Sequence, residues 1–155
     1  MRVTEMLIPL FFAVGVGLAM ATQTAVNSQL RQYLNSPIQA AFFSFLVGTI
    51  CLAIMMLVMM WNGSASKPTL SQLNEIPVWL WVGGLLGVYA VTASIYTAPK
   101  LGFLTFTGLV LFGQVIMSML LDHFGLIGVE KNPVNWQRLL GAILIAIGII
   151  FTLQR

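Results

Sequence analysis

The sequence predicts an all-α membrane protein, a bundle whose chain crosses the bilayer five times. Hydrophobic residues make up 59% of the 155-residue chain and charged residues only 7%, whereas soluble domains are about one quarter charged. A helix needs about 20 mostly apolar residues to cross a bilayer, and the chain contains five apolar segments of about that length. The spans and their short connections use nearly all of it, which predicts a single membrane domain over residues 1–155.

The first span is expected over residues 6–28, where an apolar stretch is followed by polar residues from Thr22 onward. Ala19-Met20-Ala21 resembles a signal-peptide cleavage site, with Arg2 as the basic end of such a peptide. Glu5 is out of place in a basic segment, which favours a helix that is retained.

The second span is expected over residues 37–61, because Asn35 and Ser36 can cap a helix and Pro37 suits its first turn. The polar residues 62–75 are typical of a loop.

The third span is expected over residues 77–98 and is closed by a tight break at Pro99-Lys100. The fourth is expected over residues 101–121, and a loop over 122–135 leads to the fifth over 136–153. The four tryptophans lie at span ends, as in an interfacial aromatic belt: they are Trp61, Trp79, Trp81 and Trp136.

Basic residues are divided almost evenly between the two sides of the predicted membrane. Arg2, Lys67, Lys131 and Arg138 lie on the side of the N-terminus, and Arg31, Lys100 and Arg155 lie on the other. A chain with one fixed orientation usually has a clear cytoplasmic excess. Two hypotheses stay open. Either the chain inserts in both orientations and pairs as an antiparallel dimer, or one dominant helix places the N-terminal side in the cytoplasm.

The charged residues lie at span ends or in loops, where charge costs little. Their scatter provides no basic stripe for nucleic acid. The sequence contains no cluster with metal-ligand spacing, no phosphate-binding loop and no readable catalytic triad, so we expect no enzyme activity, cofactor or metal. Asp122-His123 is either a coupled pair or a solvated helix end.

Neutral polar side chains are the candidate site residues inside the spans. Burying an unpaired amide in hydrocarbon costs about 4 kcal/mol or more, so these groups should face a watery cavity or a partner helix. The candidates for a substrate cavity fall on three spans: Gln23 and Asn27 on the first, Tyr89 and Thr92 on the third, Gln114 and Ser118 on the fourth. The alternative for each amide is interhelical hydrogen bonding, which is typically worth about 0.6 kcal/mol.

Four glycines are candidates for close helix packing. Gly83 and Gly87 form a GxxxG pair on the third span. Gly141 and Gly148 lie one heptad apart on the fifth, where the same helix of a second copy could approach.

Seven short segments in order resemble the YdcZ-type five-helix family of the drug/metabolite transporter superfamily. They are Gly15…Gln23…Asn27, Phe43-Ser44-Phe45-Leu46-Val47-Gly48, Val82-Gly83-Gly84-Leu85-Leu86-Gly87, Ala98-Pro99-Lys100-Leu101-Gly102, Phe112-Gly113-Gln114, Asp122-His123-Phe124-Gly125 and Arg138-Leu139-Leu140-Gly141. The fifth span is also similar to the last helix of small multidrug resistance proteins, which has two glycines seven apart at the dimer contact.

The resemblance implies half of a ten-helix transporter of the inner (plasma) membrane of a bacterial cell. Such a half would pair as a homodimer, or with a related chain, and move small organic compounds by alternating access. Small multidrug resistance proteins carry a glutamate in their first helix, and this chain has no acidic residue at mid-span there. Proton coupling and cationic-drug selectivity therefore do not carry over. The alternatives are a non-transporting membrane subunit that stabilises a partner protein and, more weakly, a pore.

Overall fold

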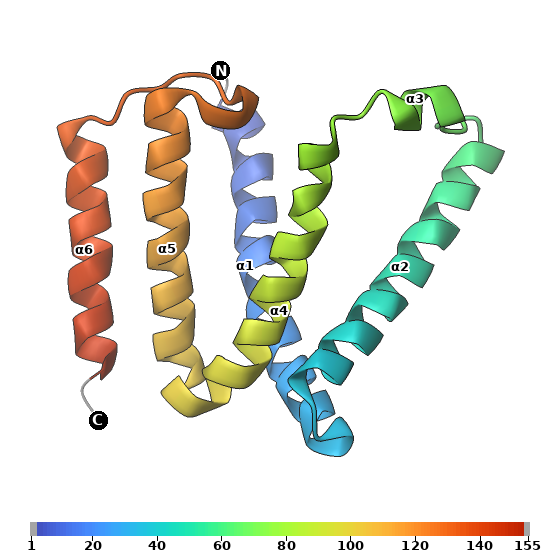
Figure 1. Cartoon of the computed structure of the whole chain (residues 1–155). Helices are drawn as coiled ribbons and strands as arrows, with labels where there is room; N and C mark the ends of the chain where they lie inside the picture. Colours follow the sequence, from blue (N-terminus) through green and yellow to red (C-terminus); the bar gives the residue numbers. More distant parts are fainter. Residues whose placement is uncertain (1–2, 154–155) are drawn as a thin grey trace. The chain divides into compact units, whose positions relative to one another are not determined.

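The computed structural model describes the backbone of residues 3–153 and the side chains of residues 7–153. Arg2 and Arg155 of the charge comparison, and the side chain of Glu5, lie outside the described residues. Figure 1 shows the helices, whose bounds are α1 (Val3–Leu34), α2 (Pro37–Trp61), α3 (Leu70–Asn74), η1 (Val78–Trp81), α4 (Val82–Leu101), α5 (Phe103–Phe124), η2 (Leu126–Gly128) and α6 (Trp136–Leu153). No strand occurs between residues 3 and 153.

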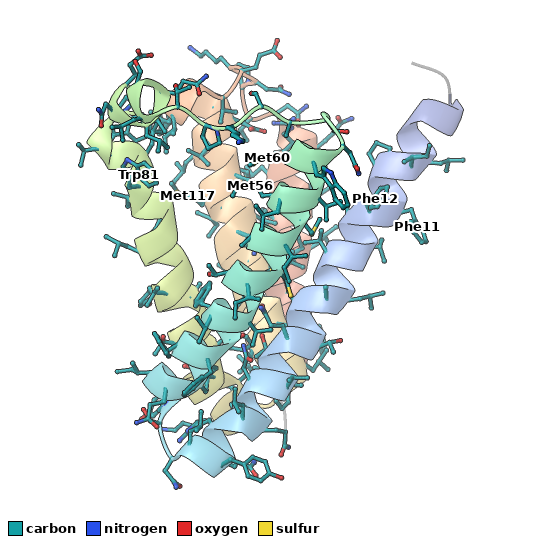
Figure 2. All side chains as sticks on the ribbon, turned by 90° about the vertical axis from the view of Figure 1, so that its right-hand side faces the viewer. Phe11, Phe12, Met56, Met60, Trp81 and Met117 are labelled. Carbon is teal, nitrogen blue, oxygen red and sulfur yellow. The ribbon has the colours of Figure 1, made fainter. Side chains whose placement is uncertain are left out.

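The prediction of an all-α chain with five membrane-spanning helices is confirmed. Five helical segments are long and apolar enough to cross a bilayer, and they are Leu7–Leu34, Pro37–Trp61, Val78–Leu101, Phe103–Phe124 and Trp136–Leu153. Their large apolar side chains are mostly exposed, as lipid contact requires. On α1, for example, Phe11 and Phe12 project from the helix (Figure 2) and are 77% and 67% exposed.

The first helix is longer than predicted, because it continues past residue 28 to Leu34. The polar residues after Asn27 include good helix formers, so their polarity does not end the helix. Asn35 ends it with a φ of 54°, in the left-handed region that asparagine tolerates. Ser36 then caps α2, where its side chain accepts a hydrogen bond from the Gln39 backbone N–H at 3.4 Å. The predicted cap and proline start of the second span are therefore confirmed.

The prediction that residues 62–75 are all loop is wrong, because they include α3. Thr69 and Gln72 form a capping box in which each side chain accepts a hydrogen bond from the backbone N–H of the other residue. This reciprocal pair satisfies two backbone donors that would otherwise lack partners, which explains a helix in a polar segment.

The break between the third and fourth spans also lies later than predicted. Pro99 lies inside the last turn of α4, which continues through Lys100 to Leu101. The chain turns at Gly102, whose φ of 84° favours glycine. Proline can end a helix before itself, but here the left-handed glycine three residues later ends it.

The chain divides into two compact units, Met1–Tyr96 and Thr97–Arg155. The core of the first unit consists of Ala40 and Ala41 of α2 with Ile95 of α4, and Leu30 and Leu34 of α1 pack against it. In the second unit, the buried residues are Ala98 of α4, Thr105 of α5, and Ala142 and Ile149 of α6. Small side chains at both cores let the helices approach closely, as is usual in membranes, where lipid provides no hydrophobic drive for packing.

Candidate substrate-binding grooves

Near the start of α5 and the end of α6, a close glycine contact and a hydrogen bond join the two helices. A β-carbon added at Gly108 of α5 would lie 3.1 Å from Cγ1 of Ile149, so Ile149 occupies the space that the missing side chain leaves. One turn earlier, buried Thr105 donates its hydroxyl proton to the backbone carbonyl of Thr152 at 2.9 Å. These contacts fix α5 against α6 and therefore shape the grooves on either side of their contact.

A mixed polar and apolar groove of about 470 Å³ runs along one side of this helix pair. Gln114, Ser118 and Asp122 line it from α5, at a spacing of four residues that puts them on one helix face. Arg138 and Gly141 line it from α6. The volume is in the range of small-molecule sites. The structure thus brings Gln114 and Ser118 together, as predicted, and adds an ion pair that the sequence alone did not assign to them.

The ion pair joins Nη1 of Arg138 and Oδ2 of Asp122 at 2.9 Å. Each side chain is about a third exposed, so solvent weakens the attraction, and pairs of this kind contribute about 0–1 kcal/mol. The Asn132 backbone N–H donates to the Asp122 backbone carbonyl at 2.7 Å, and the Asn132 carbonyl accepts from Arg138 Nη1 at 3.4 Å. The loop after α5 therefore folds back on the pair and holds it at the end of the groove.

Asp122 and His123 have different partners, so they do not form the coupled pair considered from sequence. Nδ1 of His123 accepts a hydrogen bond from the Val134 backbone N–H at 3.2 Å. The imidazole lines a second groove of about 470 Å³ on the α5–α6 pair, and nearly all its other lining residues are apolar. Asp122 instead lines the polar groove. Asp122 and His123, although adjacent in sequence, therefore line different grooves.

The first unit has a groove of its own, of about 660 Å³, beside α2 and α4. Tyr89 and Thr92 line it together, as their spacing predicted, and Tyr96 lies at the same surface. Tyr89 is 74% exposed. The Tyr96 ring lies 5.6 Å from the Arg31 guanidinium of α1, and Arg31 donates a hydrogen bond to the Ile95 carbonyl at 3.4 Å. Arg31 thus fastens the end of α1 to α4 beside the groove.

Gln23 and Asn27 line neither of these two grooves. The side chain of Gln23 is exposed, whereas Asn27 is only 4% exposed and lies beside buried Ser28. Although Gln23 and Asn27 are four residues apart on α1, Gln23 is therefore open to a ligand or partner, whereas Asn27 is packed inside the first unit.

The predicted packing glycines differ in their surroundings. A β-carbon at Gly87 would lie 3.7 Å from the Phe45 ring of α2, whereas one at Gly83, Gly141 or Gly148 would meet nothing within 4 Å. Gly87 therefore contacts another helix, and the other three leave open space. Sequence reasoning missed Gly108, the glycine with the tightest helix contact. Its signal was Thr105 three residues earlier, which puts two small residues on one face of α5.

Five apolar helices that are long enough to cross a bilayer define a multi-pass membrane protein. The chain belongs to the DMT_YdcZ family, whose model, described as "Putative inner membrane exporter, YdcZ", matches residues 8–151. The protein is thus a multi-pass inner-membrane protein of a transporter family, as the resemblance implied. No curated protein and no solved structure matches the chain.

Proposed function

We propose that this chain is one half of a transporter that moves small organic compounds across the inner membrane by alternating access. The observation that carries the proposal is the polar groove of α5–α6, where Gln114 and Ser118 lie among apolar side chains in a volume suited to a small molecule. The family match over nearly the whole chain supports the same class of function. A single membrane domain formed by residues 1–155 would be the transporting protomer.

Exposed amides support pairing with a second copy or a related chain. Gln23 and Gln114 are exposed in the protomer, yet an amide facing hydrocarbon without a partner costs about 4 kcal/mol or more. A second set of five helices would enclose these groups and complete a ten-helix transporter with a central cavity. Gln23, Asn27, Tyr89, Thr92, Gln114 and Ser118 would contribute to that cavity or its walls.

An antiparallel dimer would account for the nearly even distribution of basic residues. Inverted repeats are common in transporters because the two halves can exchange roles as the cavity opens to each side. A Cys51→Ser variant with one new cysteine at Lys67 tests this arrangement. A membrane-impermeant thiol reagent should label about half of the protein from each side of the membrane. Complete labelling from one side only would contradict the antiparallel dimer.

A substitution at Gln114 tests the groove as the site of transport. Gln114→Ala should reduce substrate uptake into vesicles because it removes the groove's amide, while the protein still inserts and folds. Gln137→Ala is the matched control, since Gln137 is exposed at the start of α6 and does not line the polar groove. Uptake by Gln114→Ala at the wild-type rate would remove Gln114 from the site.

The second candidate function is a membrane subunit that stabilises a partner protein without transporting anything. It is favoured by one observation, because the middle of each span lacks an Asp, Glu, His, Lys or Arg side chain that could couple transport to an ion gradient. This function predicts no flux from the purified chain in proteoliposomes, with or without an ion gradient.

A further inference from the structure

The ion pair at the end of the polar groove uses only some of the hydrogen-bonding atoms of its two side chains. Nη1 of Arg138 makes both the bond to Asp122 Oδ2 and the bond to the Asn132 carbonyl. Among the described residues, Nε and Nη2 of Arg138 and Oδ1 of Asp122 have no hydrogen-bond partner. A guanidinium can hold a carboxylate with two parallel bonds, so this single-bonded pair can still recruit a charged ligand.

The two charges of the pair restrict which ligand fits. An organic anion bound to Arg138 would add a second negative charge beside Asp122. An organic cation bound to Asp122 would add a second positive charge beside Arg138. Either ligand leaves the end of the groove with a net charge, which is unfavourable where the charges are partly buried. A ligand that carries both charges replaces the contact on each side, and the site remains neutral.

Opening the pair to admit such a ligand is inexpensive. Both side chains are about a third exposed, and ion pairs this accessible to solvent contribute little stability. The two residues also belong to different helices, Asp122 to the last turn of α5 and Arg138 to the first turn of α6. Rotamer changes of the two side chains can therefore separate them while the helices stay in place.

The rest of the groove fits the uncharged part of the ligand. Ser118 and Gln114 lie one and two turns before Asp122 on α5, so the polar face extends about 12 Å from Asp122 along the helix. Leu111, Val115 and Ile145 line the same groove with apolar side chains. A molecule with a charged end and an apolar body can place the first at the ion pair and the second along these residues.

We propose that the groove binds small zwitterions with an apolar body, which have a carboxylate for Arg138 and an ammonium for Asp122, as apolar amino acids do. The ion pair between Asp122 and Arg138 then forms when no ligand is bound, and its two side chains separate to bind the ligand. This substrate class rests on the proposed transport function, but binding to the groove can be measured without transport.

The test is binding of matched compounds to the purified full-length chain in lipid nanodiscs, measured by calorimetry. Leucine is compared with isocaproate, which lacks the ammonium, and with isoamylamine, which lacks the carboxylate. Methionine and phenylalanine are compared with their corresponding acids and amines. The wild-type protein should bind at least one of the three zwitterions with a Kd at least tenfold lower than those of its matched acid and amine.

Charge-removing variants should change the preference in opposite directions. Asp122→Asn should favour the acid over the zwitterion, and Arg138→Gln should favour the amine. Lys67→Gln removes one positive charge from an exposed loop and should keep the wild-type order. If either single variant does not fold, the Asp122→Arg/Arg138→Asp double variant keeps an ion pair and should keep the preference for the zwitterion.

Three results would overturn the inference. The first is that, in all three series, the wild-type protein binds the acid or the amine as tightly as the zwitterion. The second is that it binds no compound in any series. The third is that the folded Asp122→Asn and Arg138→Gln variants keep the wild-type order of affinities. Zwitterion binding without saturable flux of any compound would refute the proposed transport function alone. Saturable transport of unrelated compounds without zwitterion binding would refute the substrate class alone.

Discussion

Ile149 of α6 packs so closely against Gly108 of α5 that a β-carbon added at Gly108 would lie 3.1 Å from Ile149 Cγ1. The atom in the way is next to the branch point of the isoleucine side chain and not at its flexible end. A side chain added at residue 108 would therefore require Ile149 to shift, which would disturb the contact between α5 and α6.

Gly108→Ala should lower the stability of the protein. Overpacking a tight contact costs about 1–3 kcal/mol, whereas alanine gains up to about 1 kcal/mol in helix propensity. The expected net loss is about 1 kcal/mol, measured by thermal unfolding in detergent micelles.

Gly113→Ala is the matched control on the same helix, because an added β-carbon there meets nothing within 4 Å. It should leave the stability unchanged or raise it. Ile149→Ala should relieve the clash in combination with Gly108→Ala, so that the two changes together cost less than the sum of the two alone. Equal stability of the Gly108 and Gly113 variants would show that α5 and α6 do not pack through residue 108.

Thr105→Val should weaken the same helix pair through a lost hydrogen bond. The Thr105 hydroxyl donates to the Thr152 carbonyl at 2.9 Å and is buried, and interhelical hydrogen bonds in membranes average about 0.6 kcal/mol. Unfolding should therefore become easier by about that amount. Thr107→Val is the control, since Thr107 is exposed on the same helix. An equal effect of the two substitutions would rule out a stabilising Thr105–Thr152 bond.

Gly148→Leu tests the face of α6 that we expect to meet a second copy. A side chain at residue 148 has open space within the protomer, so leucine should not disturb the fold. It should separate two copies that approach through Gly141 and Gly148, and the dimer fraction measured by single-molecule photobleaching in liposomes should fall at least tenfold. Gly113→Leu makes the same change on α5 and should keep the dimer. An unchanged dimer fraction in Gly148→Leu would show that the two copies meet through another face.

The sequence predicted the spans well because membrane spans follow from length and hydropathy alone. Their ends were less accurate, because helix ends depend on local backbone bonds. The first span was predicted to end at residue 28, whereas the helix continues to Leu34 and Asn35 ends it. The break was predicted at Pro99-Lys100, whereas the chain turns at Gly102, which has a positive φ.

The candidate site was predicted in part. Helical spacing was enough to place Gln114 with Ser118, and Tyr89 with Thr92, in shared grooves. It did not show that Arg138 reaches Asp122, because that contact depends on how the loop between them folds. It also did not separate exposed Gln23 from buried Asn27, since burial depends on the neighbouring helices.

The most direct test of the transport function is counterflow into proteoliposomes that contain only this purified chain. Vesicles preloaded with an unlabelled zwitterion that binds the protein should take up the labelled compound transiently above equilibrium, with a saturable rate. Alternating access predicts this transient accumulation because the excess unlabelled compound inside occupies the inward-facing site and so slows the exit of the labelled compound. A linear rate without counterflow would indicate a pore, and no uptake at all would indicate a non-transporting subunit. Either result would contradict the account.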